Sequence, residues 1–301
     1  GSFPLQPKAS IMDSHGDLWF VSIGKKGMVV KYDGNDFFGF NIPEQGPVKH
    51  EPACFQDSRG AYWFAVDKKG IYRLTTDSED DKTDNVILYS EDNGLISNNI
   101  KCIFEDQWGN IWFGSDSAGL CRYEPPSEEF PYGSFGHFTV NEGLSHNNIT
   151  CLACDREGRL WIGTGGGGVS IYDGSGFSHL TTDGGLCSNF INDILEDSYG
   201  NIWVASQGGG VNMLEFCFND PNNCNLIHFT YEDNLTSNYI LKISEDRDGN
   251  ILFGTFGGTL HFYKPGFFIH TTEKQGYEYL WMKSPVEDRE GNLWFGSETG
   301  M

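Results

Sequence analysis

One short motif recurs seven times along the chain and limits what the chain can fold into. Its copies read DSHGDLWF, DSRGAYWF, DQWGNIWF, DREGRLWI, DSYGNIWV, DRDGNILF and DREGNLWF. They begin at Asp13, Asp57, Asp106, Asp155, Asp197, Asp246 and Asp288, between 42 and 49 residues apart. All copies but one have tryptophan at the seventh position, where the copy at Asp246 has Leu252. Such a period is typical of proteins built from one repeated supersecondary unit.

Each repeat resolves into four short strands, which we call A to D in chain order. In the fourth copy we expect them at residues 150–154, 160–164, 169–172 and 177–181, separated by turn residues. Units of four strands and about 40 to 50 residues are typical of propeller blades. We therefore predict an all-β fold, a seven-bladed β-propeller of four-stranded antiparallel blades.

We expect residues 1–301 to form a single domain of this kind. The seventh copy stops soon after its second strand, so the last blade is incomplete in this chain. We therefore expect the chain to be a fragment of a longer protein, and how the propeller ring closes is left open.

The repeated residues have structural roles in this fold. The aspartate and glycine belong to the A–B turn, where the carboxylate can accept bonds from backbone N–H groups and glycine can adopt a positive φ. The tryptophan is expected to pack between neighbouring blades. Two residues later stands a small residue, such as Gly114 or Gly163, where we expect a neighbouring sheet to approach closely. We expect none of these residues to be catalytic.

Charge and composition exclude several classes of partner. The chain has 42 acidic and 20 basic residues and a net charge of −22. Nucleic acids and anionic membrane surfaces bind cationic faces, so we expect neither as a partner. No apolar run approaches the roughly 18 residues that a membrane-spanning helix needs, so no direct membrane insertion by this segment is predicted.

The cysteine pattern predicts no metal site, and we expect no cofactor. Cys151 and Cys154 fall within one expected strand, where residues three apart point to opposite faces, so we interpret them as two buried thiols. Cys217 and Cys224 flank the polar segment FNDPNN, and a disulfide between them is one of two open alternatives. Residues 246–250, DRDGN, resemble part of a calcium loop but lack the later bidentate glutamate, so no calcium is expected.

The glycine run in GTGGGG, residues 163–168, is not interpreted as a phosphate-binding loop. Such a loop needs a lysine followed by serine or threonine and then a helix, whereas here Gly168 leads into the strand residues Val-Ser-Ile-Tyr. Its counterparts GSDSAG, ASQGGG and GTFGGT are the B–C loops of other repeats.

The segments that join one repeat to the next carry a family resemblance. They read EDNGLISNNI, VNEGLSHNNI, TDGGLCSNFI and YEDNLTSNYI, and with the tryptophan motif they resemble the two-component regulator propeller repeat. The resemblance implies an extracytoplasmic sensor of a hybrid two-component system, periplasmic or extracellular, that commonly recognises oligosaccharides. It also implies a second propeller or downstream signalling domains in the full-length protein. The family has no shared catalytic motif, so we do not expect an enzyme.

Ligand-binding residues are expected on the face that carries the B–C and D–A loops, because the A–B turns are nearly invariant between repeats and variable loops usually carry function. Amides that bond hydroxyl groups and aromatic rings that stack suit a carbohydrate, and lysines suit an anionic one. The candidates are Lys25, Lys26, Lys68, Asn99, His146, Asn148, Phe190, Tyr239, Tyr279 and Trp281. The repeated Ser-Asn pairs that precede some of them are expected to cap the turn into strand A, an interpretation that applies to Asn98, Asn147, Asn189 and Asn238.

Two other functions remain as alternatives. The first is a protein-interaction platform, because many propellers bind proteins. The second is a propeller enzyme, either carbohydrate-active or similar to the streptogramin B lyases, which use a histidine and magnesium. Of the eight histidines only His146 falls in a D–A loop, and no histidine–glutamate pair recurs at matching positions, so this alternative is the weaker one.

Overall fold

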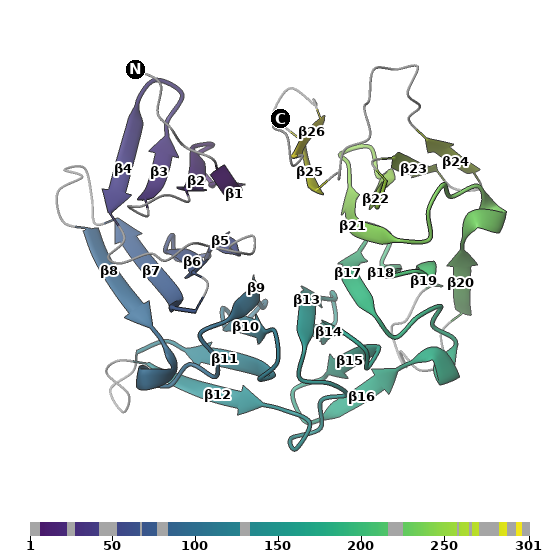
Figure 1. Ribbon diagram of the computed structural model, residues 1–301, viewed down its shortest axis with the longest axis horizontal. Helices are drawn as coiled ribbons and strands as arrows, with labels where there is room; N and C mark the ends of the chain where they lie inside the picture. Colours follow the sequence, from purple (N-terminus) through teal and green to yellow (C-terminus); the bar gives the residue numbers. More distant parts are fainter. Residues whose placement is uncertain are drawn as a thin grey trace. The chain divides into compact units, whose positions relative to one another are not determined.

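A computed structural model of the chain describes residues 7–22, 28–41, 53–66, 68–76, 84–126, 133–215, 225–257, 259–264, 267–270, 283–287 and 293–296. These residues form six four-stranded antiparallel sheets and one two-stranded sheet, in chain order (Figure 1). Each sheet contains one copy of the repeated motif, which confirms the all-β propeller fold and its four-stranded blades. The closed ring of seven blades and the single domain stay predictions, because the chain divides into two compact units that are described separately below.

The first unit comprises residues 1–142 and 147–149 and holds three sheets. Their strands are β1 (Pro7–Met12), β2 (Leu18–Ser22), β3 (Met28–Tyr32) and β4 (Phe37–Asn41); β5 (Cys54–Gln56), β6 (Tyr62–Val66), β7 (Gly70–Thr76) and β8 (Asp84–Tyr89); β9 (Ile100–Glu105), β10 (Ile111–Ser115), β11 (Leu120–Glu124) and β12 (Ser134–Phe138). The first strands of these sheets, β1, β5 and β9, contact one another in succession (Figure 1).

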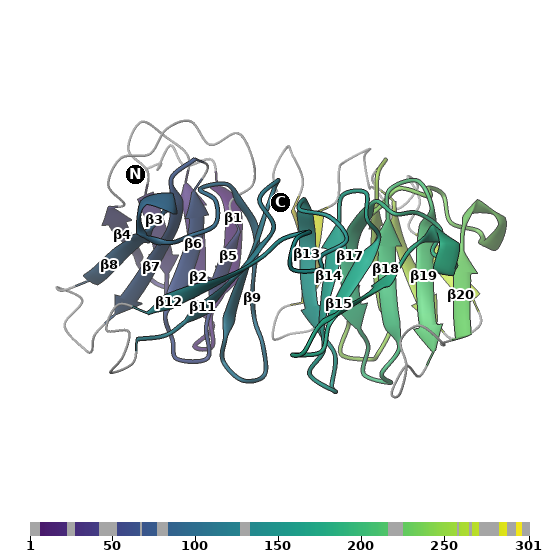
Figure 2. The same ribbon diagram turned by 90° about the horizontal axis from the view of Figure 1, so that it is seen from below.

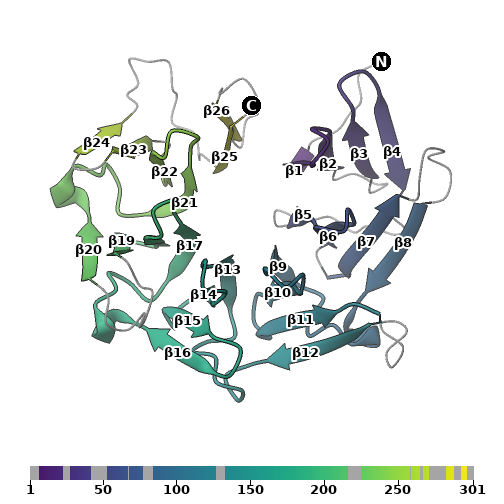
Figure 3. The same cartoon turned by 180° about the vertical axis from the view of Figure 1, so that it is seen from behind.

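The second unit comprises residues 143–146 and 150–301. Its strands are β13 (Ile149–Cys154, whose first residue belongs to the first unit), β14 (Leu160–Thr164), β15 (Val169–Tyr172) and β16 (Phe177–Leu180); β17 (Ile191–Glu196), β18 (Ile202–Ser206), β19 (Gly210–Glu215) and β20 (Asn225–Phe229); β21 (Ile240–Glu245), β22 (Ile251–Thr255), β23 (Leu260–Lys264) and β24 (Phe267–His270); β25 (Lys283–Glu287) and β26 (Leu293–Gly296). Here β17 contacts β21, which contacts β25 (Figure 3). In the fourth copy the predicted strands are confirmed to within one residue at every end.

Because neighbouring strands in each sheet are antiparallel, successive connections lie alternately at the two ends of the strands, which we call the two edges. Within each unit the A–B and C–D turns lie at one edge of the sheets, and the B–C and D–A loops lie at the other (Figure 2). Three D–A loops contain a short 3-10 helix that the sequence analysis did not predict. These are η1 (Glu91–Asn93), η2 (Thr182–Gly184) and η4 (Tyr231–Asp233).

The aspartate of the motif organises the A–B turn, as predicted. In Asp197 the Oδ1 atom accepts bonds from the backbone N–H groups of Tyr199 and Asn201 at 2.9 and 2.8 Å. The Oδ2 atom accepts a further bond from the indole Nε1 of Trp203 at 2.7 Å, inside the core. The same indole–carboxylate bond, at 2.7 or 2.8 Å, recurs in the pairs Trp19–Asp13, Trp63–Asp57, Trp112–Asp106 and Trp161–Asp155.

The tryptophans pack between neighbouring sheets, which confirms their predicted role. Trp63 of the second sheet lies 5.5 Å from Phe113 and 5.2 Å from Tyr123 of the third, measured between ring centroids. The small residue after the tryptophan also behaves as predicted. A methyl group at Gly163 would lie 2.9 Å from Cγ2 of Ile191 on the next sheet, closer than atoms in van der Waals contact. The sheets of a unit therefore approach too closely for a larger residue at this position.

Candidate functional site

The loop face of each unit is held together by backbone hydrogen bonds between its B–C and D–A loops. In the first unit the N–H of Gly70 donates to the carbonyl of Asn98 at 3.2 Å. In the second unit the N–H of Gly168 donates to Asn189, and that of Gly210 to Asn238, each at 2.9 Å. Each B–C loop is therefore fixed to the D–A loop that follows its own sheet, and side chains on both loops are presented by a rigid frame.

In three of the Ser-Asn pairs the serine caps the turn into strand A: Oγ of Ser97, Ser188 and Ser237 accepts a bond from the backbone N–H two residues later, at 3.1 Å in each case. The asparagines Asn98, Asn147, Asn189 and Asn238 have a different structural role. Each side-chain oxygen accepts a bond from the backbone N–H seven residues earlier, where the D–A loop begins. For Asn189 the donor is Thr182, the first residue of η2, at 2.8 Å. These asparagines therefore close the loop on itself, and in three repeats they satisfy an N–H group at the start of a 3-10 helix.

In the first unit the structure brings two predicted ligand residues together. Lys68 lies in the B–C loop of the second sheet with its side chain exposed, and its backbone has a positive φ of 61°. Its N–H donates to Oδ1 of Asn99 at 3.1 Å. Asn148 accepts a bond from Nζ of Lys101 at 3.0 Å. The oxygen atoms of both asparagines are thus engaged within the protein, and Lys101, which the sequence analysis did not single out, adds an exposed cation.

In the second unit three predicted residues lie beside bare glycines of the B–C loops. A methyl group at Gly166 would lie 3.7 Å from Cε1 of Phe190 and 3.8 Å from Nε2 of His146. A methyl group at Gly208 would lie 3.7 Å from the ring of Tyr239. Phe190 and Tyr239 occupy the same repeat position, so the arrangement of an aromatic ring beside a loop glycine occurs in two successive blades.

These rings are exposed to solvent although they are large and apolar. The exposed fractions of Phe190 and Tyr239 are 53% and 46%. Phe256, which is not among the predicted ligand residues, is 46% exposed and lies 5.9 Å from Tyr239 between ring centroids. The backbone beneath them is fixed, because Gln207 donates to the carbonyl of Phe190 and Phe256 donates to that of Tyr239, both at 2.8 Å. The repeat pattern predicts that Phe256 lies in a B–C loop, but nothing in it singles out this residue as a ligand contact, because no other copy has an aromatic residue there.

Several predicted residues fall outside the part of the chain that the structure describes. These are Lys25, Lys26, Tyr279 and Trp281, together with Cys217 and Cys224 of the open disulfide alternative. Of the cysteines that are described, Cys151 is buried and Cys154 is half-buried, and neither forms a disulfide.

The thiols of the described core are not disposed to react as nucleophiles. Burial raises the pKa of Cys54 and of Cys121 to about 12, so both stay protonated at neutral pH. Cys187, in the D–A loop before Phe190, has its Sγ atom 3.4 Å from Nδ1 of His228, and burial raises its pKa as well. Among the described residues no group of three or more histidine, cysteine or acidic side chains is arranged to hold a metal ion.

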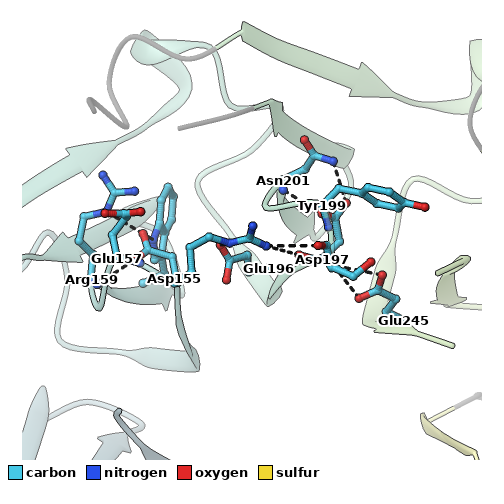
Figure 4. A network of polar contacts seen from close by, with 11 residues as sticks. Asp155, Glu157, Arg159, Glu196, Asp197, Tyr199, Asn201 and Glu245 are labelled. Atoms are coloured by element: carbon cyan, nitrogen blue, oxygen red, sulfur yellow. Dashed lines mark hydrogen bonds and ion pairs between the residues drawn. The ribbon is translucent and has the colours of Figure 1, made fainter. Parts of the chain in front are cut away.

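The opposite edge, formed by the A–B turns, carries a network of polar contacts, which Figure 4 shows for the second unit. Arg156 forms an ion pair with Glu196 of the next turn at 2.9 Å and donates to the carbonyl of Asp197 at 3.1 Å. The N–H of Ser198 in turn donates to Oε2 of Glu245 at 2.9 Å. Residues that precede the motif aspartate therefore tie neighbouring sheets together along this edge.

Four segments of the chain match the two component regulator propeller family: residues 94–117, 143–166, 185–208 and 234–257. Each segment runs from the D–A loop through strands A and B into the B–C loop, so it covers the elements that form the loop face. These segments are repeats of that family, which confirms the resemblance seen in the sequence. No curated protein sequence matches the chain.

The fold is similar to solved propeller structures. One is the extracellular domain of a candidate hybrid two component system from B. thetaiotaomicron, with a TM-score of 0.74 and 24% identity over 99% of this chain and 39% of that one. Another is the extracellular domain of a candidate one component system from the same organism, with a TM-score of 0.64 and 19% identity over 98% and 46%. A third is a catalytically inactive virginiamycin B lyase from Staphylococcus aureus with quinupristin, with a TM-score of 0.71 and 14% identity over 98% and 93%.

These identities establish a shared fold and nothing more specific. The chain spans less than half the length of either extracellular domain from B. thetaiotaomicron. In the described residues no helix is long and apolar enough to cross a membrane.

Proposed function

We propose that this chain, which carries two component regulator propeller repeats, is a ligand-binding sensor propeller that recognises an oligosaccharide on its B–C and D–A loop face. In this proposal it lies in the periplasm or outside the cell and passes its signal to a two-component system through further domains of the full-length protein. The extracellular placement of two structurally similar domains supports this location.

The observation that carries the ligand class is the repeated pairing of an exposed ring with a bare glycine. Phe190 beside Gly166 and Tyr239 beside Gly208 each present an accessible ring face, with no side chain on the adjoining loop residue to cover it. The apolar face of a pyranose ring stacks on such a surface, while its hydroxyl groups remain free to bond with polar neighbours. Two such positions in successive blades favour a ligand of more than one sugar unit.

The first unit carries exposed lysines on its own loop face, and these support binding of an anionic sugar there. Lys68 and Lys101 stand on the loop face of a chain whose net charge is −22, where cations are in the minority. A cation on this face lowers the cost of bringing a carboxylate toward an otherwise acidic protein. On the loop face of the first unit, a uronic acid would provide that carboxylate.

The direct test is a thermal-shift screen with neutral and uronic-acid oligosaccharides, followed by calorimetric titration of each glycan that stabilises the protein. A glycan at about 100 times its Kd should stabilise the folded state by about 2.7 kcal/mol. Phe190→Ala and Tyr239→Ala should each weaken binding about tenfold, which is the loss of one stacking contact of about 1 to 1.5 kcal/mol.

The matched control is Trp108→Ala, which removes an exposed ring from an A–B turn, at the opposite edge of the sheets. It should leave glycan affinity unchanged. Equal losses in all three variants would contradict the loop-face site, and the absence of any stabilising glycan would favour the protein-interaction platform. Glycans that bind should also be recovered intact, because release of products would identify an enzyme instead.

A further inference from the structure

The A–B edge of the first unit contains a hollow of about 550 Å³, on the side away from the proposed glycan face. It lies between the A–B turns of the first and second sheets, with Ser14 and His15 on one side and Arg59 and Gly60 on the other. Tyr62 also lines it, and its hydroxyl is occupied by a 2.8 Å hydrogen bond to Oδ2 of Asp13. The hollow has no part in the repeat architecture described above.

Elsewhere on this edge, a side chain of one turn covers the glycine of the next. A methyl group at Gly109 would lie 3.1 Å from Nη2 of Arg59, which also donates to the carbonyl of Gly109 at 3.4 Å. In the second unit the guanidinium of Arg156 would lie 2.9 Å from a methyl group at Gly200. In each case the turn glycine forms the floor of a socket that the preceding turn fills.

At Gly60 the socket is not filled. Apart from its chain neighbours, no atom of the described residues lies within 4 Å of the position a methyl group would take there. The preceding turn has His15 at its third position, the position that Arg59 holds in the turn covering Gly109. The hollow therefore lies where the repeat departs from its other copies, at His15 and also at Gln56 in its wall.

The equivalent pair of neighbouring A–B turns in the second unit shows which side chain can fill such a hollow. There Tyr199 (Figure 4) holds the third position. Its ring lies 3.7 Å from a methyl group placed at Gly249. The neighbouring contacts match, because the N–H of Ser198 donates to Glu245 at 2.9 Å as the N–H of Ser14 donates to Oε1 of Gln56 at 2.9 Å. The hollow thus has the framework of the Tyr199 socket without the ring.

The charges of the hollow favour a neutral ring over a second guanidinium. Gln56 directly precedes the motif aspartate, where other repeats have Glu105, Glu196 and Glu245. At this position the carboxylate that would pair with a cation is therefore replaced by an amide. Arg59 and Glu105 both line the hollow, and because their opposite charges offset each other the lining does not call for a charged guest. A neutral aromatic ring suits such a lining, because the Arg59 side chain can lie over the face of the ring, where cation and ring attract.

We propose that this hollow binds an aromatic side chain, tyrosine above all, from a partner polypeptide. The guest ring covers Gly60 as Tyr199 covers Gly249, and it contacts Arg59 and the floor at Tyr62. The volume exceeds that of one ring and accommodates the residues that flank the tyrosine in an extended segment. This site belongs to the A–B edge and is independent of glycan binding.

The test uses N-acetyl-tyrosinamide as the probe and the backbone amide signal of Gly60 in nitrogen-15 NMR spectra as the readout. The probe should shift this signal with a Kd on the order of 1 mM, as expected for so small a ligand. His15→Tyr supplies the ring within the chain, so it should weaken probe binding at least tenfold and raise the melting temperature. Asp248→Tyr is the matched control, because it places the same ring at the third position of another turn and should leave probe binding unchanged.

Three results would overturn the proposal. The first is an unmoved Gly60 signal at probe concentrations well above 1 mM. The second is equal probe binding in His15→Tyr and in the unaltered chain. The third is a shift of the Gly60 signal by methyl β-glucoside but not by N-acetyl-tyrosinamide, which would make the hollow a sugar site.

Discussion

The indole–carboxylate bond of the repeat should be measurable as stability. Asp197 is 3% exposed and accepts four hydrogen bonds: from the backbone of Tyr199 and Asn201, from Nδ2 of Asn201, and from Nε1 of Trp203. Asp197→Ala removes both acceptor oxygens and with them all four bonds. The three turn donors lie near the surface and can bond with water, so each costs about 1 kcal/mol. Trp203 is 1% exposed, and its N–H group has no access to water.

The chain contains its own control for the buried bond. Asp246 accepts the same three turn bonds, from the backbone of Asp248 and Asn250 and from Nδ2 of Asn250. Its motif has Leu252 in place of tryptophan, so no indole is left unpaired by Asp246→Ala. An unsatisfied buried donor costs about 1 to 3 kcal/mol. We therefore expect a loss of about 3 kcal/mol for Asp246→Ala and about 4 to 6 kcal/mol for Asp197→Ala.

Urea unfolding followed by circular dichroism measures both losses, and an unchanged m-value shows that the same transition is compared. Trp203→Phe removes the indole donor, so in that background Asp197→Ala should cost only what Asp246→Ala costs. This double-mutant cycle isolates the buried bond from the packing of the ring. Equal losses for Asp197→Ala and Asp246→Ala in the unaltered chain would refute the reasoning, because the tryptophan would then contribute through packing alone.

Three further predictions follow from other contacts. Gly70→Ala should lower the free energy of unfolding by at least about 2 kcal/mol in the same urea assay, because its φ is 104° and the new methyl group would lie 2.0 Å from the carbonyl oxygen of Tyr89. Burial raises the pKa of Tyr62 and of Tyr89 above the ordinary value of 10.0. Above pH 10 these tyrosines ionise in the unfolded chain but not in the folded one, so the stability that they contribute at lower pH is lost. The melting temperature should therefore fall between pH 9 and 11, and it should fall less steeply in Tyr62→Phe. Burial raises the pKa of Cys121 to about 12, so at pH 8 its thiol should react with a disulfide reagent only after unfolding, as mass spectrometry of the labelled peptide would show.

Much of the fold follows from the repeat because the responsible contacts are local. The aspartate and glycine of the A–B turn act within five residues, and the strands on either side alternate or run apolar in a way that fixes their limits. The fourth copy therefore has its strands where the sequence predicts them. The small residue after the tryptophan was also interpretable, because a repeated glycine such as Gly163 indicates a close approach between sheets.

The contacts that the sequence did not predict join residues whose relation depends on the folded loop. The bond from Thr182 to Asn189 spans seven residues, and it needs η2 to form before the asparagine can be placed. The exposure of Phe190 depends on the B–C loop glycine that lies beside it and comes from a separate turn of the same sheet. The pattern indicated correctly that Phe190 and Tyr239 vary between repeats, but it could not show that Asn99 and Asn148 direct their oxygen atoms to Lys68 and Lys101.

Functional residues are expected at the positions where the repeats differ. A residue shared by every blade satisfies a need that every blade has, as Asp197 does for its turn and its tryptophan. Where one blade has a different residue, the structural contact made in the other blades is missing or is made by another group. At the loop face, rings replace asparagine at positions 190 and 239, and they are exposed instead of packed. At the A–B edge, His15 leaves Gly60 uncovered where Tyr199 covers Gly249. The two binding surfaces proposed for this chain are thus both departures from a repeat whose remaining positions already account for the stability of the blade.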